Sequence, residues 1–183
     1  YENGHVIYME IAYDETPMRF SFTWSGDLIT EVYQSVYLQE QWQEFTHELY
    51  TYQGANLTYV LRQFKVYETW MDLQQATWTY SGSQVLSGLM EYNQVTNWEN
   101  EWQIDVIWTR DNISQTLEQW WDEDAWVNDC RDSYTYNGDG NCLTDIYEMY
   151  DGSVWYNDYK DTYTYNGTQI TNVLCEYWNG SEW

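Results

Sequence analysis

Hydrophobic and polar positions alternate along most of the chain with a period of two, which is the period of a β-strand. The clearest stretch, 155–165, places aromatic side chains on one parity and polar side chains on the other. Asn166-Gly167 follows at once, and this dipeptide favours a type I′ hairpin turn. A second alternating stretch covers 170–178. The pattern predicts a β-hairpin, and the same order of strand, Asn-Gly turn and strand recurs over 136–150.

The alternating pattern repeats along the chain at a fixed period. Consecutive members of three columns are 28 or 29 residues apart, which indicates a tandem repeat. The first column contains Trp42, Trp70, Trp98, Trp126, Trp155 and Trp183. The second contains Trp24, Tyr52, Tyr80, Trp108, Tyr136 and Tyr165. The third, two positions earlier, contains Phe22, Tyr50, Trp78, Val106, Tyr134 and Tyr163.

We therefore predict an all-β fold in a single repeat domain over 1–183. A partial unit over 1–17 precedes units over about 18–48, 49–76, 77–104, 105–132, 133–161 and 162–183. Each unit supplies two antiparallel strands, so about 13 strands follow one another in a long meander. Open sheets of more than ~10 strands tend to curl, which favours a curled or spiralling sheet. The aromatic columns are expected to share one face and to form the core.

Composition excludes several classes of function. The chain has 30 acidic and 6 basic residues, a net charge of −24, yet 20% of its residues are aromatic, which is too many for a disordered tail. Binding to nucleic acid or anionic lipid needs a basic face, and the basic residues are scattered singly. No stretch approaches the ~18 apolar residues of a membrane-spanning helix. The start at Tyr1, without an initiator Met or an apolar signal region, is what a mature or excised segment would show.

Two segments resemble a known family of repeats. Tyr134-Thr135-Tyr136-Asn137-Gly138-Asp139-Gly140-Asn141 and Tyr163-Thr164-Tyr165-Asn166-Gly167-Thr168 are similar to the YD repeats of secreted and cell-surface bacterial proteins, including RHS-type shells. They resemble more closely the Trp-containing relatives in cargo of Bacteroidetes-type secretion. The other units match loosely, and Arg110 occupies the glycine position once. The resemblance implies an extracellular, sheet-forming repeat, and the matched positions carry no catalytic residue.

No candidate for catalysis or for a bound metal or cofactor emerges. The run from Asn137 to Asp145 is similar to a calcium loop, but its register leaves the first and last ligand positions without carboxylates. The histidines, His5 and His47, lie in different units, and His47 has the polar parity of its strand, so we expect it to be exposed. No insertion interrupts the repeat frame in the way a catalytic site normally does. The sequence predicts no enzyme.

Cysteines and glycosylation motifs leave alternatives open. Cys130, Cys142 and Cys175 are odd in number, and hairpin register places Cys142 near Tyr136 rather than near Cys130. Isolated thiols are the main expectation, with an intermolecular bridge as the alternative. Four motifs match N-glycosylation acceptors, at Asn56, Asn112, Asn166 and Asn179. Turn geometry alone explains the last two, so Asn56 and Asn112 are the better candidates.

Two functions remain as the main hypotheses, with a glycosidase as a distant third. In the first, the chain is a secreted structural protein whose open sheet edges pair head to tail, giving a homopolymer that forms an extracellular filament or a surface layer. In the second, it is a carbohydrate-binding or adhesin module in which exposed Trp and Tyr stack on sugar rings. Exposure of the aromatic columns separates the two hypotheses.

Overall fold

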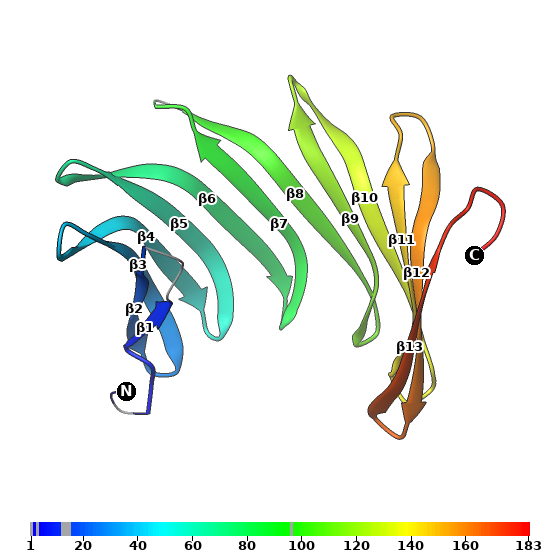
Figure 1. The fold of residues 1–183 in the computed structure, drawn as a ribbon. Coiled ribbons are helices and arrows are strands. Elements are labelled where there is room, and N and C mark those ends of the chain that lie inside the picture. The colour runs from blue at the N-terminus through cyan, green and yellow to red at the C-terminus, as the bar shows by residue number, and fades with distance from the viewer. Residues whose placement is uncertain (1, 3, 12–15, 96) are drawn as a thin grey trace. The chain divides into compact units, whose positions relative to one another are not determined.

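The computed structural model describes residues 2, 4–11, 16–95 and 97–183, and all regular elements among them are β-strands (Figure 1). The strands are β1 (Tyr8–Ile11), β2 (Met18–Ser25), β3 (Leu28–Leu38), β4 (Gln41–Gln53), β5 (Asn56–Val66), β6 (Thr69–Ser81), β7 (Gln84–Asn93), β8 (Trp98–Thr109), β9 (Asn112–Asp122), β10 (Ala125–Tyr136), β11 (Cys142–Tyr150), β12 (Trp155–Asn166) and β13 (Gln169–Tyr177).

The strands form one open antiparallel meander, which confirms the predicted all-β fold. Their order in the sheet follows their order in the chain, from β1 to β13. Two kinds of strand alternate. We call the even-numbered strands A-strands, because from β4 on they begin at or next to a Trp of the first column, and the odd-numbered strands B-strands.

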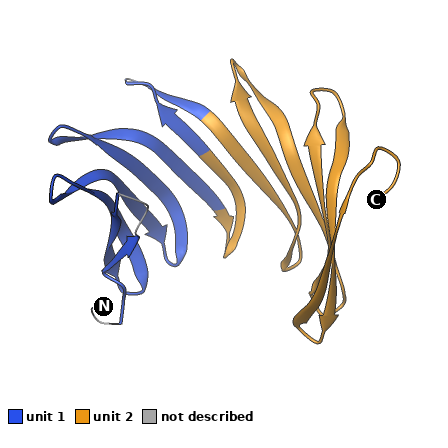
Figure 2. Cartoon of the chain, viewed as in Figure 1, with its two compact units in different colours: residues 1–79, 90–100 blue, residues 80–89, 101–183 orange. Residues whose placement is uncertain are grey.

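The chain divides into two compact units, which are described separately (Figure 2). Unit 1 contains residues 1–79 and 90–100, and unit 2 contains residues 80–89 and 101–183. In both units, neighbouring A- and B-strands pair in long hairpins, such as β4 with β5 and β12 with β13. The repeat therefore determines local pairing throughout the chain.

Most A-to-B turns have two central residues, and the first of them takes a positive φ. Gly26, Gly54, Gly82 and Gly167 occupy this position with φ between 61° and 64°. Because only the first central residue is in the left-handed region, these turns match type II′. The predicted type I′ turn at Asn166-Gly167 is therefore wrong: Asn166 pairs with Gln169, and Gly167 and Thr168 form the turn. Asn166 is the last residue of the strand instead.

Arg110 is the exception at this turn position, with a φ of 60°. A side chain in this region costs about 1–2 kcal/mol relative to the right-handed conformation. We expect Arg110→Gly to raise the free energy of unfolding by about 1 kcal/mol, and Gly54→Ala, the reverse change at the equivalent turn, to lower it by about 1 kcal/mol. Urea unfolding followed by circular dichroism tests both. Changes of the same sign in the two variants would contradict this explanation.

A repeated hydroxyl stabilises the bulge beside these turns. Thr30, Thr58, Ser114 and Thr171 are each skipped in the strand pairing. Each hydroxyl donates to a backbone carbonyl seven residues earlier, at distances between 3.0 and 3.3 Å. Each hydroxyl thus ties the bulge residue to the backbone of the partner strand.

A second bulge, in the middle of the A-strands, decides which residues share a face. Phe45, Leu73, Asp129 and Asp158 are skipped in the pairing with the preceding B-strand. Directly opposed residues lie on the same face, so Trp155 shares a face with Tyr150, whereas Tyr159 shares one with Tyr147. Alternation along β11 places these pairs on opposite faces. The prediction that both aromatic columns share one face is therefore wrong, because an inserted residue reverses the parity.

We call the side that carries the first column the Trp face and the other side the Tyr face. Neither face is a continuous core. Among the described residues, only Val32, Val106 and Cys130 are buried apolar side chains, and none is fully buried. All residues of both aromatic columns are half-buried. The predicted aromatic core is thus replaced by aromatic side chains half-covered on both faces of a single layer.

Candidate functional site: two faces and two edges

Cations lie over four of the six Trp rings of the first column. The Arg19 guanidinium lies 4.2 Å from the centre of the Trp42 ring, and the Arg131 guanidinium lies 4.5 Å from that of Trp155. Lys65 lies over Trp70 and Lys160 over Trp183. Four of the six basic residues thus make cation–π contacts, which sequence analysis did not find because most partners lie on different hairpins.

Each of these cations also pairs with a carboxylate. Arg131 donates two hydrogen bonds to Glu148, of 2.6 and 2.8 Å. Lys160 pairs with Glu176, Arg19 with Glu10 and Lys65 with Glu44. The hydrogen bonds from Arg131 to Glu148 raise the pKa of that guanidinium further. Each ring, cation and carboxylate together form a charge-neutral group that covers one side of the Trp ring.

His47 holds the same repeat position as Arg19 and Arg131, and its side chain is buried, with 7% of its surface exposed. It stacks on Tyr33 at 4.0 Å, contacts the Trp70 ring, and its Nδ1 lies 3.1 Å from Gln63 Oε1. The prediction of an exposed His47 is wrong, because the A-strand bulge turns it onto the Trp face. His5 stacks on Trp24 instead.

An open groove of about 590 Å³ lies on the Trp face of unit 1. Its lining includes Arg19, Ser35, Trp42, Glu44, Lys65 and Tyr67. Tyr67 is almost fully exposed, at 94%. Aromatic and planar polar side chains together suit a neutral sugar, although Arg19 covers one side of Trp42.

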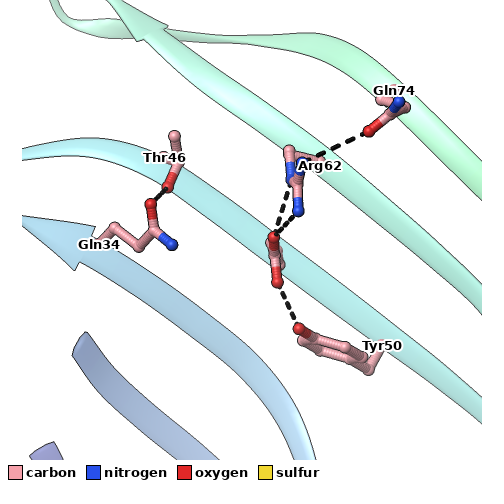
Figure 3. A network of polar contacts seen from close by, with 6 residues as sticks. Gln34, Thr46, Tyr50, Arg62 and Gln74 are labelled. Carbon is pink, nitrogen blue, oxygen red and sulfur yellow. Dashed lines mark hydrogen bonds and ion pairs between the residues drawn. The ribbon is translucent and has the colours of Figure 1, made fainter. Parts of the chain in front are cut away.

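The Tyr face of unit 1 carries a polar network (Figure 3). Arg62 donates to Glu48 at 2.8 Å and to Gln74 at 3.4 Å. Tyr50 donates to the same carboxylate, Glu48. Burial, followed by this hydrogen bond, raises the Tyr50 pKa, so its hydroxyl remains a donor. The network satisfies these charges internally.

The Tyr face of unit 2 carries three aspartates instead. Asp145 lies directly opposite Asp161, and Asp132 is on the neighbouring strand. Oδ1 of Asp145 and Oδ1 of Asp161 are buried without a hydrogen-bond partner, whereas Asp132 accepts a bond from Thr116. Burial, with repulsion from the other two carboxylates, raises the pKa of Asp145 to about 6. This row is therefore electrostatically unfavourable at neutral pH.

Tyrosines surround the three aspartates. Tyr147 and Tyr159 stack at 4.9 Å. Burial raises the pKa values of Tyr134 and Tyr163, and raises that of Tyr159 to about 12. For Tyr147 the hydrogen bond with Cys130 is the largest cause of its raised pKa. The rings stay neutral at physiological pH and lower the local polarity around the carboxyl groups.

A cluster of three side chains could offer ligands to a metal ion: Glu118, Asp129 and Cys130. Their ligand atoms all lie within 4.8 Å of one another. Asp129 is the bulge residue of β10, and sequence analysis missed the cluster because neighbours in a regular strand point to opposite faces. Trp102 Nε1 donates to Glu118, and burial raises the Cys130 pKa to about 11. A thiol ligand must lose its proton, so this burial opposes metal binding.

The cysteines and the loop at Asn137 take the positions that hairpin register predicts. Cys142 pairs with Tyr136, and all three thiols are free: Cys130 is buried, Cys142 half-buried and Cys175 exposed. The Asn137 side chain accepts hydrogen bonds from the amides of Asp139 and Asn141, which closes a turn.

The candidate glycosylation sites differ in exposure. Asn166 and Asn179 are exposed, and Asn179 accepts hydrogen bonds from Ser181 and Glu182 within a turn. Asn56 and Asn112 are half-buried at the starts of β5 and β9. Exposure of the side chain therefore favours glycan attachment at Asn166, whereas the sequence favoured Asn56 and Asn112.

The two edge strands expose apolar side chains. On β13, Ile170, Val173, Leu174 and Tyr177 are 49 to 73% exposed. On β1, Tyr8, Met9 and Ile11 are exposed as well. The Trp178 amide donates to the Asp158 carbonyl, so by alternation the amides of Val173, Cys175 and Tyr177 point away from β12. Within the described part of the chain, β13 therefore presents both a backbone edge with no neighbouring strand and apolar side chains.

No helix long and apolar enough to cross a membrane occurs in the part of the chain that the structure describes. No family model and no curated protein matches the sequence. Among solved structures, the chain is similar to a protein of unknown function from Bacteroides fragilis NCTC 9343. The match has a TM-score of 0.54 and 8% identity, and covers 63% of this chain and 91% of the other. At this identity the likeness shows a shared fold alone.

Proposed function

We propose that the chain is a secreted structural repeat protein that self-associates through its sheet edges into an extracellular filament or surface layer. The observation that carries the proposal is β13, whose apolar residues are exposed on both faces and whose outer backbone groups have no strand neighbour among the described residues. Proteins normally shield such an edge with short strands, proline or charge. β13 has nine residues and no proline, so it is suited to pairing.

Assembly through unlike edges is head-to-tail, and it extends indefinitely when the rotation between copies does not close a ring. The net charge of −24 opposes it. This repulsion is screened over about 8 Å at physiological ionic strength, whereas strand pairing acts at contact distance. Secretion and glycan attachment at Asn166 belong to the same proposal, and the YD-like segments and the exposure of Asn166 support them.

Replacing Val173 with Lys should abolish assembly, because the new charge on the edge removes an apolar contact and repels the incoming strand. Val95→Lys is the matched control: Val95 is 87% exposed and lies in a turn of unit 1 away from both edges. Light scattering and electron microscopy at physiological salt measure the outcome. A wild-type chain that stays monomeric, or equal loss in both variants, would contradict the proposal.

A second candidate function is carbohydrate binding at the groove of unit 1. The nearly free Tyr67 ring beside the polar groups of that groove favours it. Titration with a neutral oligosaccharide, followed by tryptophan fluorescence, distinguishes it from assembly. A response lost in Tyr67→Ala but kept in Val173→Lys would support binding independent of the sheet edge.

A further inference from the structure

The alternation of strand types restricts how two copies can join. Within the chain, each internal B-strand lies between two A-strands. β13 is a B-strand with an A-strand, β12, on one side only among the described residues. The other end of the sheet is also a B-strand, β1, so a direct joint of β13 to β1 would place two B-strands side by side. That arrangement does not occur among the described strands, whose order in the sheet is that of the chain.

β1 is weakly attached compared with the other strands. It has four residues, all of them exposed, and it pairs with only four of the eight residues of β2. Its side chains contribute the Arg19–Glu10 ion pair and a cation–π contact of Arg19 with the Tyr8 ring at 5.4 Å. Just before the strand, the Phe22 amide bonds to the Ile7 carbonyl, Trp24 Nε1 donates to the Val6 carbonyl, and His5 stacks on Trp24. The next strand in the sheet is β2, an A-strand. Removal of β1 would thus expose an A-strand, which is the type of neighbour that β13 has on one side only.

We propose that β1 is a removable cap, an inference that rests on the proposed function. After β1 has left the sheet, β13 of one copy pairs with β2 of a second copy. The joint then continues the A–B alternation without interruption. β13 offers nine residues for pairing where β1 offers four, so the exchange gains backbone hydrogen bonds.

Hydrogen-bond phase and repeat register agree at this joint. Because Phe22 bonds to Ile7, the amides of Phe20 and Met18 also face β1 and become free when it leaves. Internal pairs such as Gln34–Thr46 and Val32–Glu48 set the register. In the repeat, β13 is equivalent to β3 and β2 is equivalent to β4. The same pairing therefore places Cys175 opposite Met18 of the second copy and Val173 opposite Phe20. The outward-pointing amides and carbonyls of β13 thus face the carbonyls and amides of β2 that β1 has released.

Side-chain chemistry at the joint is compatible as well. On one face, Val173 and Cys175 meet Met18 and Phe20 of the second copy, all of them apolar. On the other face, the residues equivalent to the internal pair Tyr33–His47 are Leu174 and Arg19 of the second copy, which therefore lie opposite each other. Glu176, two residues after Leu174, is then the diagonal neighbour of Arg19. A carboxylate is therefore within reach of the guanidinium that loses Glu10.

The test locks β1 to β2 with a disulfide. Tyr8 and Ser21 are directly opposed and, by alternation from the Ile7–Phe22 bond, form a non-hydrogen-bonded pair with Cα atoms about 4.5 Å apart, within disulfide reach. We expect the Tyr8→Cys, Ser21→Cys double variant to stay monomeric when oxidised and to assemble when reduced. The single variant Tyr8→Cys, oxidised in the same way, controls for the native thiols.

Glu10→Gln provides an independent measurement, because it weakens the cap without blocking it. Assembly should become about fivefold faster than in the wild type, as expected for loss of a partly exposed ion pair. Assembly of the oxidised double variant at the wild-type rate would overturn the cap proposal. If Val173→Lys still prevented assembly in that case, the proposed function would stand with a different partner edge.

Discussion

Trp155→Ala should lower the free energy of unfolding by about 3 kcal/mol, because truncating a large aromatic side chain leaves its neighbours without contacts. The ring packs against Tyr150 at 5.1 Å and lies under the Arg131 guanidinium at 4.5 Å. Arg131 in turn holds Glu148 through two hydrogen bonds. The loss therefore combines aromatic packing with a cation–π contact.

Tyr156→Ala is the matched control for this prediction. Tyr156 is the next residue, lies on the Tyr face and is 43% exposed. Its replacement should lower the free energy of unfolding by about 1 kcal/mol, because the Tyr156 side chain buries less apolar surface than the Trp155 side chain. Urea unfolding of both variants measures the difference. Equal losses would show that the layer of cation and ring does not stabilise unit 2, and would reopen the Trp face to ligand binding.

Asp145→Asn should stabilise the chain at pH 7.5 and have little effect at pH 3.5. Burial and the charges of Asp132 and Asp161 raise the pKa of Asp145 to about 6, from its ordinary value of 3.8. The folded state thus holds this proton more tightly than the unfolded state. Its contribution to stability is fully present below pH 3.8 and is lost as the pH rises through about 6. An amide removes the charge and therefore that loss.

The expected gain at pH 7.5 is about 1.5 kcal/mol, half of what the full pKa difference corresponds to, because the carboxyl group is partly screened by solvent. Asp139→Asn, in the exposed turn after β10, is the control and should change little. Thermal unfolding across pH 3.5 to 8 measures both variants. A gain that does not depend on pH, or an equal gain in Asp139→Asn, would exclude repulsion within the aspartate row as the cause.

The sequence by itself determined the features that depend on neighbours in the chain. Alternation over 155–165 predicted β12, and Gly167 marked the end of that strand to within a residue. The repeat period predicted the number and order of strands, because each hairpin can pair only with the next when connections are short. The position of Cys142 beside Tyr136 followed from the same local register.

Only the tertiary structure decided which side chains share a face and what they contact. A bulge at Asp158 reverses the parity of β12, and nothing in its residue type signals whether the neighbouring strand skips it. That reversal separates the two aromatic columns in β12. The equivalent bulges at Phe45 and Asp129 bury His47 and bring Arg131 over Trp155, 24 residues away along the chain. The physical reason is that alternation is a property of one strand, whereas the face a residue occupies depends on hydrogen bonding between strands.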